Sequence, residues 1–249
     1  VSELPEESLD IIVSNPPYSI KWEGDDNPVL INDPRFSPAG VLAPKSKADL
    51  AFIMHSLAWL ASNGTAAIVC FPGIMYRGGA EQKIRKYLVD NNFIDCIIQL
   101  PGNLFFGTSI ATCIMVLKKS KAENKTLFID ARKMGYMVDR KHRDFTEGIQ
   151  EDGSFGDIDL LAKTFEDFQN GELEEKKGFS TIATIEDIAK QDYILTPGRY
   201  VGIEEQEDDG EPFEEKMTRL TSELSEMFEK SHELEDEIRR KLGAIGYEI

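Results

Sequence analysis

The sequence predicts an α/β fold, in which an open and mostly parallel sheet is flanked by helices and carries an antiparallel strand near its edge. Up to residue 146, apolar runs of strand length alternate with segments whose apolar residues recur at helical spacing. A short connection between two of these runs predicts that the second strand is antiparallel. Beyond residue 146 the sequence is mainly helical and ends in a heptad repeat, which predicts a long coiled-coil-like helix.

The first elements surround a proline-rich motif. Residues 9–14 are apolar and predict a buried strand. Residues 19–46 form a loop rich in Pro, Asp and Asn, which is either functional, as a lid or a contact loop, or an insertion. Residues 47–62 have helical apolar spacing, and Asn63-Gly64 is a typical helix end. We expect the remaining elements of this region to be a helix at 79–91 and strands at 65–71, 93–100, 111–118 and 127–130.

Charge divides the chain into regions. The whole sequence has a net charge of −17, yet residues 1–146 contain 17 Lys and Arg against 16 Asp and Glu, whereas residues 147–249 contain 11 against 29. We therefore expect one sheet domain at 1–146, a mixed helical extension at 147–203, and an acidic linker with a helix at 204–249. A strongly acidic region is repelled by phosphates, so it is expected to face protein.

The C-terminal regions are predicted to contain three helices. Residues 157–169 have helical spacing, and residues 184–187 have the pattern of a capped helix start. After an acidic linker at 204–211, apolar residues alternate at steps of four and three, with Ser231 filling one gap. This stripe either packs on its own domain or docks onto another subunit, and the sustained heptads favour docking. The seam consists of Phe213, Met217, Leu220, Leu224, Met227, Leu234 and Ile238.

The three cysteines, Cys70, Cys96 and Cys113, lie in apolar strand-like runs without the spacing of a disulfide framework or a metal site. They are expected to be small buried side chains in a reducing cytoplasm. No apolar run has the length of a membrane span.

Asn15, Pro16, Pro17 and Tyr18 follow the first strand, and their order suits the chemistry of a planar amino group such as that of adenine. The Asn15 side-chain oxygen and the Pro16 carbonyl oxygen can accept its two N–H bonds, which frees the nitrogen lone pair for attack. The prolines fix the backbone, and the Tyr18 ring offers a face on which a base can stack. The alternative is an ordinary turn after a strand. Because such folds bind ligands at the carboxyl edge of the sheet, the motif predicts a catalytic site there.

Five segments carry a family resemblance: DIIVSNPPY (10–18), KADLAFIMHSL (47–57), NGTAAIVCFPGIMYRGGAEQKIRKYL (63–88), IDCIIQLPGNLFFGTSIATCIMVLKK (94–119) and YILTPGRYV (193–201). Together they resemble the modification subunits of type I restriction–modification systems, which are adenine-N6 DNA methyltransferases. The resemblance implies a Rossmann-like methyltransferase sheet. It also implies transfer of a methyl group from S-adenosylmethionine to an adenine that is flipped out of the duplex.

The family's cofactor loop, an acidic or aromatic residue followed by a G-x-G turn, precedes the NPPY strand. Here the sequence starts shortly before that motif, and the glycine-rich stretch at 73–79 has the wrong spacing for a dinucleotide fingerprint. We therefore expect a C-terminal part of a larger enzyme, with a partial sheet that holds the cofactor only at the Asn15 edge. The fragment alone is expected to be inactive, and no metal is expected.

The resemblance also implies partners and contact residues. Phe106 is expected to pack on the flipped base opposite Tyr18, with burial as the alternative role. The implied partners are double-stranded DNA, a specificity subunit that meets the heptad seam, a restriction subunit and a second modification subunit. The residues expected to contact DNA are Lys45, Lys47, Arg77, Arg140, Lys141 and Arg143.

Two other functions remain open. An NPPY strand end also suits the side-chain amide of glutamine, as in protein glutamine-N5 methyltransferases. The chain could also be a non-catalytic module for subunit assembly. The RGGAE and LTPGRY segments and the acidic helical tail favour the DNA methyltransferase.

Overall fold

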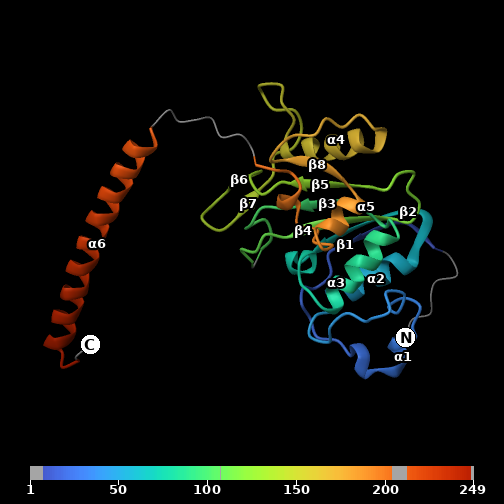
Figure 1. The fold of residues 1–249 in the computed structure, drawn as a ribbon, viewed down its shortest axis with the longest axis horizontal. Coiled ribbons are helices and arrows are strands. Elements are labelled where there is room, and N and C mark those ends of the chain that lie inside the picture. Colours follow the sequence, from blue (N-terminus) through green and yellow to red (C-terminus); the bar gives the residue numbers. More distant parts are fainter. Residues whose placement is uncertain (1–7, 107, 204–211, 248–249) are drawn as a thin grey trace. The chain divides into compact units, whose positions relative to one another are not determined.

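The computed structural model describes residues 8–106, 108–203 and 212–247, and it confirms the predicted fold class (Figure 1). The chain divides into two compact units between Glu204 and Glu205. The first unit contains a six-stranded sheet with helices on its faces, and the second consists of one long helix. The finer division of the first unit at residue 146 stays a prediction.

The sheet has the strand order β1-β2-β4-β3-β5-β8. Pairing is parallel between β1 and β2 and between β3 and β5, whereas β4 runs antiparallel to both β2 and β3. The antiparallel direction predicted for residues 111–118 is therefore confirmed, and a second antiparallel strand, β8, closes the far edge. The strands are β1 (Leu9–Ser14), β2 (Leu60–Cys70), β3 (Ile94–Gln99), β4 (Cys113–Lys118), β5 (Lys125–Asp130) and β8 (Ser180–Thr184).

Helices cover both faces of the sheet (Figure 1). Buried side chains of α2 (Asp49–Trp59), α3 (Ala80–Asp90) and α5 (Ile185–Lys190) join the larger apolar cluster on one face. Side chains of α4 (Asp157–Asn170) pack against the cluster on the other face. These helices confirm the predicted helical segments, and Thr184 and Asp187 form the predicted capping box of α5. The short elements are η1 (Gly24–Asp26), α1 (Pro28–Ile31), η2 (Pro72–Met75), η3 (Pro197–Arg199), β6 (Tyr136–Met137) and β7 (Arg143–Asp144).

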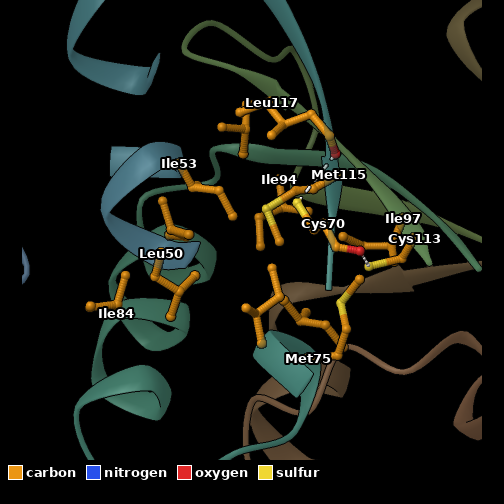
Figure 2. Close-up of a cluster of buried hydrophobic side chains, with 14 of the residues drawn as sticks. Leu50, Ile53, Cys70, Met75, Ile84, Ile94, Ile97, Cys113, Met115 and Leu117 are labelled. Atoms are coloured by element: carbon orange, nitrogen blue, oxygen red, sulfur yellow. Dashed lines mark hydrogen bonds between the residues drawn. The ribbon is translucent and has the colours of Figure 1, made fainter. Parts of the chain in front are cut away.

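The larger core joins α2 and α3 to the middle of the sheet (Figure 2). Leu50 and Ile53 of α2, Ile84 of α3, and Met115 and Leu117 of β4 belong to this core, and all five are buried. The three cysteines are free and buried, as the sequence predicts. Because the close-packed core extends to the ends of β2 and β4, it gives the adjoining carboxyl edge of the sheet a rigid base.

The burial predicted for strand 9–14 is wrong in part. β1 forms at the predicted residues, but it is an edge strand paired only with β2. Ile12 packs on the larger core, whereas Ile11 and Val13 on the opposite face are 75% and 82% exposed. The reason is that neither a neighbouring strand nor a helix within the described residues covers that side of β1.

The helix end predicted at Asn63-Gly64 is also wrong. α2 ends at Trp59, and both residues lie inside β2, which starts at Leu60. A Cβ atom on Gly64 would lie 2.8 Å from the Leu9 carbonyl oxygen and 2.9 Å from that of Asp10. Gly64 therefore permits the close approach of β1. Glycine is typical of such strand positions as well as of helix ends, so the residue type alone did not distinguish the two.

The second unit contains α6 (Phe213–Ala244), which confirms the predicted C-terminal helix. The seam residues are all exposed, and the predicted linker at 204–211 lies outside the described residues. None of the helices in the described part of the chain is long and apolar enough to cross a bilayer.

Candidate active site

The NPPY motif leaves the sheet at the carboxyl end of β1, as predicted. Because β1, β2, β3 and β5 run in the same direction, their following residues meet at one edge of the sheet. Asn15 and Pro17 are exposed there, and Pro16 and Tyr18 are half-buried. The Asn15 side chain therefore stands at an open surface and not in the packed interior.

The Asn15 amide oxygen already accepts a hydrogen bond. The Tyr18 hydroxyl donates to Asn15 Oδ1 at 2.9 Å. Burial raises the pKa of Tyr18, with a smaller contribution from the nearby Cys70, so the phenol remains protonated and able to donate. This hydrogen bond fixes the orientation of the Asn15 amide and leaves the second lone pair of Oδ1 for another donor.

The motif rests on a packed base. Pro16, Pro17 and Tyr18 enclose a void of only about 10 Å³ together with Asp49 and residues 69–71. A space of this size barely holds one water molecule. The prolines therefore lie directly against the end of β2, which fixes the backbone that carries the Pro16 carbonyl.

Asp49 fixes the exit of the motif, and the sequence did not reveal this role. Its Oδ1 accepts a hydrogen bond from the Ser19 backbone N–H at 3.0 Å, and the Ala48 N–H donates to the Ile20 carbonyl at 2.9 Å. Ser19 has a φ of 50°, a left-handed conformation that a residue other than glycine adopts only when its surroundings hold it. Asp49 is 7% exposed and begins α2. In the sequence, Asp49 could be recognised only as an acidic residue in the first turn of a helix, which indicates a helix start and no further role.

Phe105 and Phe106 have different environments on the loop between β3 and β4. Phe105 packs against the smaller core, whereas Phe106 is 89% exposed. The Phe106 ring lies 4.5 Å from the His142 ring, between centroids. Thr108 supports the loop, since its Oγ1 accepts a hydrogen bond from the Ile110 N–H at 3.1 Å. The structure thus leaves Phe106, the predicted stacking residue, free to meet a ligand.

Some of the basic residues predicted to contact DNA have partners within the chain. Lys45 pairs with Asp25 and Asp26, and Arg77 lies over the Phe71 ring and 3.6 Å from Glu81. A Cβ atom on Gly73 would lie 2.4 Å from the Arg77 guanidinium carbon, so the glycine-rich stretch at 73–79 accommodates this side chain.

The remaining basic residues lie on two segments. Arg143 donates to the Met134 and Gly135 carbonyls, and this anchors the β6–β7 hairpin. Arg140 and Lys141 project from the tip of the hairpin and are exposed. Lys47 is half-buried beside the start of α2. DNA contact by any of the six stays a prediction.

Comparison with known proteins assigns the family. The profile of the N-6 DNA Methylase family matches residues 2–209. The chain belongs to this family. It is 41% identical to the type I restriction enzyme HindI methylase subunit of Haemophilus influenzae over 98% of this chain and 53% of that protein. It is 40% identical to the type I restriction enzyme MpnII methylase subunit of Mycoplasma pneumoniae over 94% of this chain and 40% of that protein.

The solved structures agree with this assignment. The type I restriction-modification system methyltransferase subunit from Streptococcus thermophilus superposes with a TM-score of 0.69 at 36% identity. The match covers 80% of this chain and 39% of that structure. The chain thus spans about half the length, or less, of the relatives it matches, and the resemblance to type I modification subunits is confirmed.

Which residues of this N-6 DNA methylase chain contact S-adenosylmethionine stays a prediction. In the glycine-rich stretch at 73–79, which follows β2, Gly73 packs against the Arg77 side chain. Asn15, which is predicted to lie at the cofactor edge, is exposed at the carboxyl end of β1. No group of three or more potential metal ligands occurs among the described residues.

Proposed function

We propose that this chain carries the methyl-acceptor half of an adenine-N6 DNA methyltransferase, as part of the modification subunit of a type I restriction–modification complex. The supporting observation is the exposed Asn15 amide, held by Tyr18 at the carboxyl edge of the sheet. The family membership and the type I relatives favour this function over a glutamine-N5 methyltransferase.

The proposed role of the motif is to activate the adenine amine. Asn15 Oδ1 and the Pro16 carbonyl accept the two N–H bonds, which localises the lone pair on nitrogen and stabilises the positive charge that develops there. Preorganised acceptors act without reorganisation, and the packed base under the prolines supplies this rigidity. S-adenosylmethionine, when bound, supplies the methyl group.

Tyr18 and Phe106 are proposed to hold the flipped adenine between them. Because Asn15 Oδ1 has a second lone pair for the amine, Tyr18 can keep its hydrogen bond to Asn15 while its ring stacks on the base. Each aromatic–base stack contributes roughly 1–3 kcal/mol, comparable with the few kcal/mol needed to unstack a base from the duplex.

The decisive experiment identifies the product. The full-length subunit with its specificity partner is incubated with duplex DNA and S-adenosylmethionine, and the nucleosides are analysed by mass spectrometry. We expect N6-methyl-2′-deoxyadenosine, which is lost in Asn15→Ala and retained in the control Asn63→Ala, an exposed asparagine inside β2. Methylation of glutamine in a protein substrate, without DNA methylation, would contradict the proposal.

The seam of α6 is proposed to dock onto the specificity subunit. A restriction subunit and a second modification subunit are the further proposed partners in the assembled complex. Leu224 is 49% exposed on α6, and Glu223 beside it pairs with Arg219 on the surface of the same helix. We expect Leu224→Asp to abolish co-purification with the specificity subunit. Ser225→Asp adds the same charge one residue away, outside the seam, and is expected to leave co-purification intact. Equal behaviour of the two variants would contradict docking through the seam.

A further inference from the structure

The loop that carries Phe106 is joined to the β6–β7 hairpin, which holds Arg140, Lys141 and Arg143, three of the residues predicted to contact DNA. β6 and β7 pair through Tyr136–Asp144 and Met137–Arg143. The Arg143 backbone N–H donates to the Asn103 carbonyl at 2.8 Å, which fastens the hairpin to the β3–β4 loop. The hairpin therefore has a fixed contact with the segment that presents Phe106.

His142 is the aromatic side chain that this hairpin places against Phe106. The ring centroids are 4.5 Å apart and the planes are inclined by 42°. Aromatic pairs at this separation contribute about 0.5–1.5 kcal/mol beyond their buried area. For a phenyl ring that is 89% exposed, such a contact favours the rotamer that makes it.

Asp139 in turn fixes the imidazole. Its Oδ2 lies 2.7 Å from His142 Nδ1, and its Oδ1 accepts the backbone N–H bonds of Lys141 and His142 at 2.7 and 2.9 Å. The hydrogen bond with His142 lowers the pKa of Asp139, so the carboxyl group remains an acceptor. The Val138 N–H closes the turn on the His142 carbonyl at 2.9 Å. The histidine ring is thus held at one end by the carboxylate while its face meets the phenyl ring.

A hollow of about 390 Å³ adjoins this pair. Thr108 and Ser109 of the loop and Arg140, Lys141 and His142 of the hairpin line it, with Asn103 and Phe105. Two exposed cations beside an exposed aromatic ring are the side chains that single-stranded nucleic acid meets in its binding grooves, where cations contact phosphate and rings stack on bases.

We propose that His142, held by Asp139, is a positioning residue that fixes the Phe106 ring for stacking on the flipped adenine. This inference rests on the proposed function, because it needs a base to stack. His142 does not touch the reacting atoms, and its effect on methyl transfer passes through Phe106.

The test uses the full-length subunit with its specificity partner and duplex DNA that carries 2-aminopurine at the target adenine. Extrusion of this base from the stack raises its fluorescence, and methyl transfer to unmodified DNA is followed in parallel. We expect Phe106→Ala to reduce single-turnover methyl transfer by roughly 5- to 150-fold, from the 1–3 kcal/mol of a stacking contact. His142→Ala and Asp139→Ala are expected to reduce it about 2- to 12-fold, with little change in the dissociation constant for DNA. His142→Phe keeps a ring against Phe106 and is expected to restore most of the rate, and His232→Ala on α6 is the matched control.

A double-mutant comparison separates positioning from a general structural role. If His142 acts through Phe106, adding His142→Ala to Phe106→Ala causes no further loss of rate or fluorescence. Additive losses, or a wild-type rate and fluorescence signal in His142→Ala, would overturn the inference. The proposed function fails separately, by methyl transfer that is undiminished in Asn15→Ala.

Discussion

Substitution of Asp49 tests whether the NPPY exit is held from α2. Asp49→Ala removes the acceptor of the Ser19 N–H at 3.0 Å, and a hydrogen bond to a charged group contributes about 1.5–3 kcal/mol. It also removes a negative charge from the first turn of α2, which contributes about 0.3–1 kcal/mol.

Two effects oppose this loss. Asp49 Oδ2 is buried and has no hydrogen-bond partner among the described residues, so its desolvation already destabilises the fold. The charge of Asp49 also repels the nearby Glu81, whose pKa is raised mainly by burial and lowered by Arg77. Removing Asp49 relieves this repulsion. With roughly 1–2 kcal/mol for these offsets, the expected net loss is about 1–2 kcal/mol. For a chain of this size, that lowers Tm by about 2–8 °C.

Urea unfolding of the chain measures the loss of stability in Asp49→Ala. Single-turnover methyl transfer by the full-length enzyme measures whether the substitution also disturbs the NPPY motif. Asp49→Asn keeps an acceptor oxygen and is expected to recover most of the stability. Asp90→Ala, which removes an exposed carboxylate paired with Lys86, is the control and should change stability by less than about 0.5 kcal/mol. If Asp49→Ala unfolds at the wild-type urea midpoint and methylates at the wild-type rate, Asp49 does not hold the motif.

Two further predictions concern buried cations. Arg85 is 1% exposed and donates to the carbonyls of Ile74, Arg77 and Tyr193. We expect Arg85→Ala to lower the free energy of unfolding by about 3–5 kcal/mol, because three acceptors lose their donor, and a loss below about 1 kcal/mol by urea unfolding would refute this. Burial lowers the pKa of Lys121 to about 8, with Asp95 opposing. Between pH 8 and 10.5 the unfolded chain therefore binds more protons than the folded chain, so the free energy of unfolding rises with pH. Relative to Lys121→Met, wild type should gain up to about 3 kcal/mol of unfolding free energy across that range. Parallel curves of unfolding free energy against pH would contradict the burial of Lys121.

The sequence predicted β1 to β5 and the helices that cover the sheet because their apolar patterns are local, but it did not predict the edge strand β8. β3 and β4 were found because their runs are long and apolar. The same property misled at β1, since an apolar run does not reveal whether both faces are covered. Gly64 misled for a related reason, because its role depends on the Leu9 and Asp10 carbonyls of a strand far away in sequence.

The features of the candidate site that the sequence did not predict depend on tertiary contacts. The β6 and β7 strands have two residues each, too few to produce a periodic pattern. The contact of His142 with Phe106 depends on how that hairpin packs against the β3–β4 loop. Asp49 lies 30 residues from Ser19, so no local pattern joins them. Asn15 and Tyr18, by contrast, are three residues apart, and their motif was evident from the sequence alone.

The rate of methyl transfer in a single turnover is the most direct test of the role assigned to Asn15. With saturating DNA and S-adenosylmethionine, replacing Asn15 by alanine in the full-length enzyme should slow transfer to adenine about 10²- to 10³-fold, the usual effect of removing one preorganised group that stabilises developing charge. The dissociation constant for DNA should change by less than about threefold, since Asn15 acts on the transition state. A transfer rate within about twofold of wild type would contradict the account, because the adenine amine would then be activated elsewhere.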